Sequence, residues 1–295
     1  MNKISYGASI LWKRFVKASV STIDKKIKDD MVELSEKNSF LSDDIIRIKI
    51  NSCSNNVRFI CSQVNEITVE LTGQVNSKLA DNFILDTEVN DKELNIALRS
   101  KKTSHIGIII DLSILKITVP QKHFDSIDID SSSADADIED ISASTVTFIS
   151  DSGDINANKI IVKDTLSVET SSGDIHIMNT KASKLNVRSS SGYINTRYVT
   201  AMFTNSKTSS GDIKLITNEL KGKTTVESNS GDVSIISDNQ PESLKVDFKS
   251  SSGDANIRLQ GLTYDKNKRN AVVGTIGSGE HELTVRTSSG DFSLT

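Results

Sequence analysis

From about residue 44, apolar and polar residues alternate with a period of two, which is typical of β-strands with one buried face. Five strands are predicted in the first half of the chain, at residues 45–50, 57–61, 66–73, 93–100 and 114–120. We expect Pro120 to end the last strand because proline has no amide donor for a sheet. The first two strands are predicted to form a hairpin that turns near Asn55 and Asn56.

In the second half, the alternation is organised by a repeat of 19 or 20 residues that is marked by Ser-Ser-Gly-Asp or a close variant. The glycines of the seven copies are Gly153, Gly173, Gly192, Gly211, Gly231, Gly253 and Gly290, and Ala134 is the origin of a degenerate eighth. The last interval is about two periods long. We therefore expect one copy around residues 260–280 to have eroded or become a loop.

Each repeat is predicted to contribute two short strands that share an apolar face. Counted from the glycine, positions −7, −5, +2 and +4 hold mostly Ile, Val, Leu, Ala or Phe. No unit of this size can bury that face alone, so the units must stack. The predicted fold is mainly β, a parallel β-helix (β-solenoid) with coils of about 20 residues. A propeller blade would need about 40 residues, and a sandwich would not require copies in register.

The tetrapeptide itself is interpreted as a structural corner. Its glycine would permit a positive φ angle at a sharp turn, and the Ser or Thr at −3 would point inward and hydrogen-bond to neighbouring coils. The residue at +1 is acidic in all but one copy, where Tyr193 replaces it. The acidic residues are Asp135, Asp154, Asp174, Asp212, Asp232, Asp254 and Asp291. We expect each Asp to cap its own corner; calcium binding by this column is the alternative.

The N-terminal residues 1–40 follow a helical rather than a strand period, with apolar residues at steps of three and four. Residues 1–28 hold seven Lys or Arg and one Asp, a local charge of +6. The predicted basic amphipathic helix would lie on an anionic membrane surface, or pack on its own β domain or a partner helix. The candidate membrane or partner contacts are Leu11, Trp12, Lys13, Arg14, Phe15 and Lys17.

The predicted domains are therefore the helix at 1–40, a β-strand region at 41–124 that caps the solenoid, and the solenoid at 125–295. The apolar run at residues 4–12 is too short for a signal peptide, and no 18-residue apolar run predicts a membrane span. A cytoplasmic or peripheral membrane location, with envelope association, is the expectation.

Composition and motifs favour a non-enzymatic protein without cofactors. The net charge of −4 gives no general attraction to nucleic acid. The predicted hairpin does not pair Cys53 with Cys61, and no Cys or His pairs have zinc-site spacing. The acids are spread through turns, the four His residues stand apart, and residues 274–280 lack the Lys-Ser/Thr ending of a phosphate loop.

Four segments carry a resemblance to a known family: DDIIRIKINSCSNNVRFICSQVNEITVELTG, LSILKITVPQKHFDSIDIDSSSADADI, the serial TSSGDI corners, and the ending IGSGEHELTVRTSSGDFSL. In this order they resemble the bacterial "putative adhesin" family, a domain of unknown function, over about residues 43–295. The resemblance implies a β-helix, a bacterial source and association with the cell envelope. It implies no catalytic residues.

Three functions follow as hypotheses. The first is an envelope-associated binding or scaffold protein, with the solenoid wall as contact surface for a protein or envelope component and the N-terminal helix as tether. The second is a homo-oligomer that assembles through an open C-terminal coil, because the chain stops after the strand FSLT. The third is a carbohydrate-active β-helix enzyme. Departures from the repeat, at Tyr193, Thr204, Ser206 and residues 260–280, are the places to look for a site.

Overall fold

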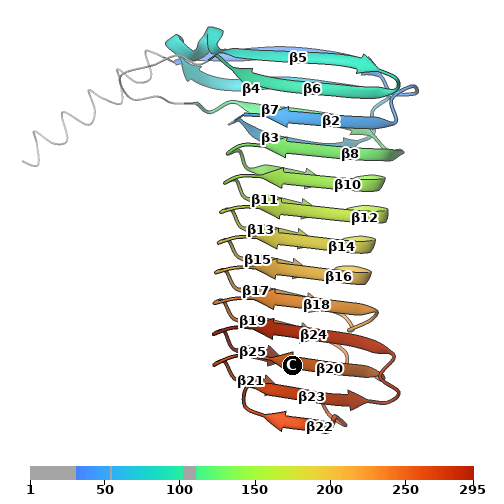
Figure 1. Ribbon diagram of the computed structural model, residues 1–295. Coiled ribbons are helices and arrows are strands. Elements are labelled where there is room, and N and C mark those ends of the chain that lie inside the picture. The colour runs from blue at the N-terminus through green and yellow to red at the C-terminus, as the bar shows by residue number, and fades with distance from the viewer. Residues whose placement is uncertain (1–30, 54, 102–110) are drawn as a thin grey trace, which may run out of the picture.

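The computed structural model describes residues 31–53, 55–101 and 111–295. These residues form two long sheets that face each other (Figure 1). Sheet A has twelve strands in the order β1-β4-β7-β3-β9-β11-β13-β15-β17-β19-β25-β21. Sheet B has thirteen, in the order β22-β23-β20-β24-β18-β16-β14-β12-β10-β8-β2-β6-β5. The described helical structure is one 3-10 helix, η1 (Ser77–Asn82).

The central part is a parallel β-solenoid, as predicted. Each coil runs along sheet B, turns at the Ser-Ser-Gly-Asp corner and returns along sheet A. The sheet B strands are β8 (His123–Ser131), β10 (Ser142–Ser150), β12 (Ile161–Thr170), β14 (Lys181–Ser189), β16 (Thr200–Thr208) and β18 (Lys223–Ser228). The sheet A strands are β9 (Ala136–Glu139), β11 (Ile155–Asn158), β13 (Ile175–Met178), β15 (Ile194–Arg197), β17 (Ile213–Thr217) and β19 (Val233–Ser237).

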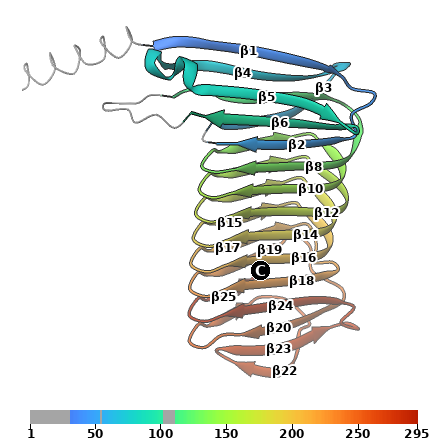
Figure 2. The ribbon, with the colours of Figure 1, turned by 45° about the horizontal axis from the view of Figure 1, so that its top comes forward.

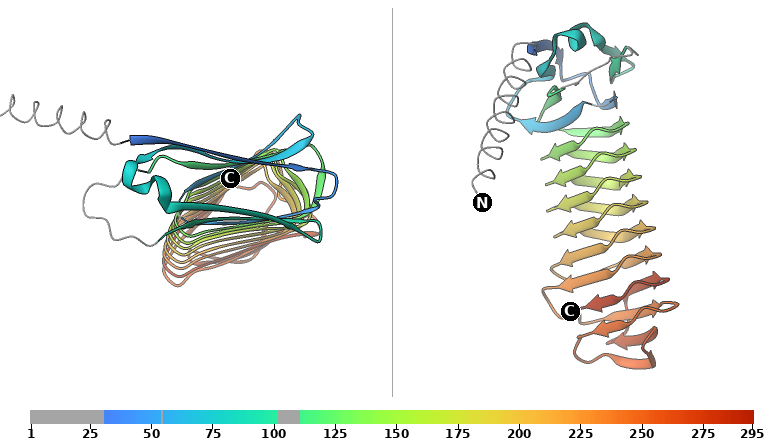
Figure 3. Two further views of the ribbon diagram at one scale, coloured as in Figure 1. Left: turned by 90° about the horizontal axis from the view of Figure 1, so that it is seen from above. Right: turned by 90° about the vertical axis from the view of Figure 1, so that its left-hand side faces the viewer.

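Equivalent strands pair in parallel with the repeat columns aligned. Leu166 lies opposite Leu185, and Ile155 opposite Ile175. The inward side chains of the two sheets meet in a single core. Seen from above, the coils lie over one another (Figure 3). Stacking therefore buries the apolar columns, which a single coil would leave exposed to water.

The N-terminal strands extend both sheets and close one end (Figure 2). They are β1 (Met31–Leu41), β2 (Arg47–Ser52), β3 (Asn56–Ser62), β4 (Glu66–Asn76), β5 (Phe83–Asn90), β6 (Glu93–Ser100) and β7 (Ile114–Pro120). Antiparallel strands form the outermost layer here, with β1 on β4 in sheet A and β5 on β6 in sheet B. Pro120 ends β7 as predicted.

The predicted hairpin at residues 45–61 is wrong. Strand β2 pairs in parallel with β6 and β8 in sheet B, whereas β3 pairs in parallel with β7 and β9 in sheet A. Ile48, Ile50, Val57 and Phe59 occupy the same inward columns as the later repeats. This segment is thus a further coil, because stacking between two coils buries both of its edges.

The predicted helix is wrong over residues 31–40, which belong to β1. This strand pairs along its whole length with β4 and so supplies an edge partner for sheet A. Residues 1–30, including Leu11, Trp12, Lys13, Arg14, Phe15 and Lys17, lie outside the described residues. None of the helical structure in the described part of the chain is long and apolar enough to cross a membrane.

At the other end, the order of coils in space departs from their order in sequence. The last strands are β20 (Leu244–Lys249), β21 (Ala255–Ile257), β22 (Thr263–Lys268), β23 (Ala271–Ile276), β24 (His281–Thr287) and β25 (Phe292–Leu294). Strand β24 lies between β18 and β20, and β25 lies between β19 and β21. The final coil is therefore inserted between two coils that precede it in the sequence.

Two predictions are corrected by this arrangement. The strand FSLT is not an open edge, because β21 covers it, so the proposed route to self-assembly through an open last coil is wrong. The segment around 260–280 is not an eroded coil. It forms the antiparallel hairpin β22–β23, which continues sheet B beyond β20 and closes that end.

Candidate functional site

The glycines of the Ser-Ser-Gly-Asp corners permit close contact between coils. None of the seven has a positive φ angle, so the predicted reason for glycine is wrong. A Cβ atom on Gly192 would collide with the carbonyl oxygen of Gly173, and the other six glycines face the preceding corner in space in the same way. Positive φ angles occur instead at the opposite corner of each coil, directly after β9, β11, β13 and β15. The residues are Asp140, Lys159, Asn179 and Tyr198.

The Ser or Thr at position −3 holds each corner together. The hydroxyl of Ser189 accepts a hydrogen bond from the N–H of Gly192 at 2.8 Å and donates to the carbonyl of Gly173 in the adjacent coil at 3.4 Å. Thr170 and Ser228 make the same two contacts. The prediction that this hydroxyl points inward and links neighbouring coils is confirmed. The hydroxyl donates to the adjacent coil, whereas the N–H that it accepts from belongs to its own corner.

The acidic column is a hydrogen-bond ladder along the solenoid. The N–H of Asp174 donates to Oδ1 of Asp154 at 2.7 Å, and the N–H of Asp154 donates to Oδ1 of Asp135 at 2.9 Å. Each carboxylate thus caps the neighbouring coil, not its own corner as predicted. Asn56 begins the ladder by accepting from the N–H of Asp135 at 3.2 Å.

The same ladder crosses the inserted last coil. The N–H of Asp291 donates to Asp232, and that of Asp254 donates to Asp291, each at 2.8 Å. Within the described residues, no group of three or more His, Cys, Asp or Glu side chains is placed to hold a metal ion. The corner glycines and aspartates of the repeat therefore have architectural positions that the contacts explain.

Tyr193 interrupts this ladder because its side chain has no carboxylate oxygen to offer to the N–H of Asp212. Its own N–H still donates to Asp174 at 2.7 Å, and its ring meets the ring of His176 edge-on at 6.2 Å. Burial raises the pKa of the Tyr193 phenol, and the carboxylates of Asp212 and Asp174 raise it further. At this position the ladder is therefore replaced by a small cluster of Tyr193, His176, Asp174 and Asp212.

The opposite corner changes its construction between β16 and β18. In the coils from β9 to β16, two residues separate each sheet A strand from the next sheet B strand, and the first of the two is left-handed. In the coil of β17, the turn widens to residues 218–222, and its left-handed residue is Gly222, with φ of 72°. Strand β18 consequently begins at Lys223, opposite Phe203, and residues 200–202 at the start of β16 have no β18 partner.

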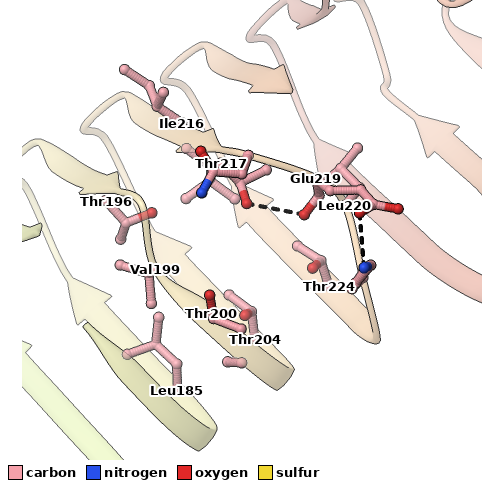
Figure 4. Close-up of a pocket in the computed structure, with 14 residues that line it drawn as sticks. Leu185, Thr196, Val199, Thr200, Thr204, Ile216, Thr217, Glu219, Leu220 and Thr224 are labelled. Carbon is pink, nitrogen blue, oxygen red and sulfur yellow. Dashed lines mark hydrogen bonds and ion pairs between the residues drawn. The ribbon is translucent and has the colours of Figure 1, made fainter. Parts of the chain in front are cut away.

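A pocket of about 210 Å³ lies between the short turn that follows β15 and the wider turn at residues 218–222 (Figure 4). Its apolar lining comes from Leu185, Val199, Ala201, Leu215, Ile216 and Leu220. Its polar lining comes from Thr196, Thr200, Thr204, Thr217, Asn218, Glu219, Lys221 and Thr224. Thr204 and Thr224 occupy the column that holds Leu166 and Leu185 in earlier coils, and the smaller side chains leave the space unfilled.

The charges at the pocket mouth are already paired. Lys221 Nζ lies 2.8 Å from Glu219 Oε2, and the backbone carbonyl of Glu219 accepts a hydrogen bond from Thr217 Oγ1 at 3.0 Å. The hydrogen bond with Glu219 raises the pKa of Lys221. The pocket is therefore lined by both threonine hydroxyls and apolar side chains. The charges of Lys221 and Glu219 neutralise each other.

Large apolar side chains are exposed at residues that neighbour the pocket lining in the sequence. Met202 is 63% exposed and Phe203 is 51% exposed, and Tyr198 is exposed at the adjoining turn. The guanidinium of Arg197 lies 5.7 Å from the centre of the Tyr198 ring. We call the pocket together with Tyr198, Met202 and Phe203 the open corner. Clustered apolar exposure of this kind marks contact surfaces in soluble proteins.

The structure brings together only some of the departures noted in the sequence. Thr204 lines the pocket, and Ser206 lies two residues further along β16, fully buried, with no hydrogen-bond partner for its Oγ atom among the described residues. Tyr193 lies at the other end of β15, and residues 260–280 belong to the terminal cap. The exposed pair Met202 and Phe203 was missed, although Thr at the −7 column in two successive repeats marked the weakened core.

The two cysteines belong to the coil of β2 and β3, which is inserted between the strands β6 and β7 on one side and β8 and β9 on the other. Cys61 lies in β3, and Cys53 follows β2, so they come from strands of different sheets. Both thiols are free. Burial raises the pKa of the Cys61 thiol, and Asp140 raises it further. Neither thiol lines the open corner.

The architecture defines the class as a parallel β-solenoid closed by antiparallel strands. The chain belongs to the Toastrack DUF4097 family, whose model matches residues 45–295. The family resemblance predicted from the sequence is thereby confirmed.

Several solved bacterial structures are similar to this chain. A protein described as a putative adhesin from Bacteroides fragilis has 13% identity over 89% of this chain and 97% of that chain, with a TM-score of 0.49. Another from Parabacteroides distasonis has 16% identity over 89% and 97%, with a TM-score of 0.45. A putative cell adhesion protein from Clostridium sporogenes has 12% identity over 89% and 99%, with a TM-score of 0.29. No curated protein matches the chain.

Proposed function

We propose that this chain is a non-enzymatic, envelope-associated bacterial binding protein and that the open corner is its contact surface for a protein partner. The observation that carries the proposal is the exposure of Met202 and Phe203, which lie in β16 between the pocket-lining residues Ala201 and Thr204. Envelope association is what the family resemblance implies. The basic, apolar residues 11–17 are proposed as a tether to the membrane surface.

A protein partner fits the dimensions of the pocket. Its volume of about 210 Å³ is below the range of roughly 300–1,000 Å³ that is typical of small-molecule sites. One large side chain of a partner, inserted into the pocket and surrounded by Met202 and Phe203, would form the buried centre that dominates many protein interfaces. The threonine hydroxyls would then bond to backbone groups that flank the inserted side chain.

The rest of the solenoid wall serves as a scaffold in this proposal. Its outer positions carry ladders of polar side chains, for example Asn156 Nδ2 donating to Asp137 Oδ1 at 3.0 Å. Salt bridges also cross between coils, such as Lys207 to Glu227 at 2.8 Å. Such self-paired surfaces present few unsatisfied groups to a partner, so the open corner stands out against them.

Affinity capture from source-cell envelopes tests this function. We compare the full chain with the double variant Met202→Ser and Phe203→Ser, and with Ile149→Ser, which removes a 42% exposed apolar side chain from the same sheet. The proposal requires a saturable partner that is retained by Ile149→Ser and lost from the double variant. Equal retention by all three proteins would contradict the open corner as contact surface.

The tether is tested separately by flotation with anionic liposomes. The full chain is expected to float, whereas a variant in which Leu11, Trp12 and Phe15 are all replaced by Ser is expected to remain at the bottom. Equal flotation of both proteins would contradict the membrane tether and would leave the capture experiment unaffected.

A further inference from the structure

The C-terminal coil, residues 281–295, occupies a slot between residues 223–237 and residues 244–257. It is joined to β23 by residues 277–280, in which Gly277 and Gly279 have φ angles of 58° and 69°. Figure 1 shows β24 and β25 between these neighbours, although both are last in the sequence. The slot is therefore filled by a coil that follows both of its spatial neighbours in the sequence.

Both faces of the inserted coil make the standard contacts of the repeat. Gly290 lies against the carbonyl of Gly231, and Gly253 lies against the carbonyl of Gly290. In sheet B, Val285 is in register with Val226 on one side and Phe248 on the other. Phe292 stacks on Phe248 with ring centres 5.1 Å apart. Nothing in these contacts depends on which copy of the chain supplies the coil.

We propose that the C-terminal coil is exchangeable and that two copies of this chain form a dimer by reciprocal insertion of residues 281–295 into each other's slot. The exchanged dimer re-forms every contact of the closed monomer, including burial of Leu283, Val285, Phe292 and Leu294. The main structural difference is then in residues 277–280. Exchange of an identical element between protomers is a low-cost route to a dimer for this reason.

The connection between β23 and β24 has the geometry of a hinge. Ile276 and His281 both lie opposite Leu244, on the two sides of β20. Residues 277–280 must therefore turn back across two strand spacings, about 10 Å. If these residues straighten, β24 is carried away from its own slot and toward a neighbouring copy. Glycine adopts both the turned and the extended conformation readily.

The other inserted coil, residues 47–62, lacks this freedom. It lies in the middle of the chain, between β1 and β4, which pair with each other along eleven residues. It is attached to that pair at both ends, through residues 42–46 and 63–65, so two connections would have to rearrange for it to leave its slot. The inference is therefore confined to the C-terminal coil.

Mixed disulfides between two variants test the exchange. Both carry Cys53→Ser and Cys61→Ser, and one adds Asp232→Cys and the other Asp291→Cys. These positions are adjacent in the ladder, where strand spacing of about 4.8 Å is within disulfide reach. After the two full-length chains are unfolded and refolded together at high concentration, we expect a disulfide-linked heterodimer. The matched control is Asp154→Cys mixed with Asp174→Cys, neighbours in the same ladder on interior coils.

A second measurement uses light scattering on a variant that lacks Ser278 and Gly279. The two remaining residues are too few to turn back across β20, so the molecular mass should double relative to the monomer. A folded monomer from this variant would overturn the proposal. So would a heterodimer yield no higher than that of the interior control pair, and this result decides the matter if the deletion prevents folding.

Discussion

The backbone N–H of Asp174 donates to the Oδ1 atom of Asp154, one coil away, at 2.7 Å. This relationship recurs along the corner edge and explains why aspartates stack there despite their like charges. Every carboxylate of the column except that of Asp254 accepts a hydrogen bond from a backbone amide. Such charge-assisted bonds offset a repulsion of about 1 kcal/mol per neighbour in water. The acidic column is thus part of the connection between coils.

Replacement of Asp154 separates the hydrogen bond from the charge. Asp154→Ala removes the acceptor for the N–H of Asp174 and should lower the free energy of unfolding by about 1 kcal/mol. Asp154→Asn keeps an Oδ1 acceptor and removes one charge from the column, so its unfolding midpoint in urea should stay at or above that of the parent. Equal losses for Ala and Asn would show that the charge, not the bond, matters.

The corner glycines should tolerate no side chain. Gly192→Ala places a Cβ against the carbonyl of Gly173 and forces the coils apart, at a cost of about 3 kcal/mol or more. Gly261 provides the contrast, because it has φ of 72° and open space around its Cβ position. Gly261→Ala should cost only about 1 kcal/mol, from the left-handed backbone alone. Chemical denaturation of both variants measures the difference, and the reverse order would contradict the close-contact role.

The two buried serines Ser189 and Ser206 should respond oppositely to replacement by alanine. Ser189 links its own corner to the next coil, so Ser189→Ala should destabilise by about 1–2 kcal/mol. Ser206 has a fully buried hydroxyl without a partner among the described residues, so Ser206→Ala should stabilise by about 1 kcal/mol. Thermal or urea unfolding of the pair is the measurement. Destabilisation by Ser206→Ala would mean that its hydroxyl has a partner.

Tyr193 should add a pH dependence to stability at alkaline pH. Burial and two carboxylates raise its pKa in the folded protein above the value of about 10 expected in the unfolded chain. The unfolded state therefore loses the proton first, and stability is lost as pH rises from the unfolded pKa through the folded one. Tyr193→Phe lacks this loss. Unfolding midpoints of both proteins are measured from neutral pH to about pH 11. Apart from a constant difference at neutral pH, the parent should lose more stability than Tyr193→Phe as the pH rises. A steeper loss in Tyr193→Phe would contradict the raised pKa.

The repeat columns made the solenoid predictable, because Leu166, Leu185 and their equivalents have to be buried by stacking. The same columns were present at Ile48, Ile50, Val57 and Phe59, and comparison with the later repeats could have identified that coil. Local turn residues at Asn55 and Asn56 favoured a hairpin instead. The interleaved order of the end coils was not predictable, since identical corners such as Asp254 and Asp291 fit either position in the stack.

The candidate site was only partly predictable for a similar reason. Thr204 and Ser206 showed that the core softens, but the missing β18 partner of residues 200–202 depends on where β18 begins, after the wider turn that ends at Gly222. For the corner glycines, the sequence indicated the positions but not the role. Their positions were evident from the sequence, and their role in close packing required the neighbouring coil to be seen.

The most direct test of the proposed contact surface is photocrosslinking in the source cell, with a photoreactive amino acid in place of Phe203 or, as control, Ile149. The open corner predicts one discrete adduct with an envelope protein from position 203, and its loss when Thr204→Leu fills the pocket. No adduct at position 203, or the same adduct from both positions, would contradict the account.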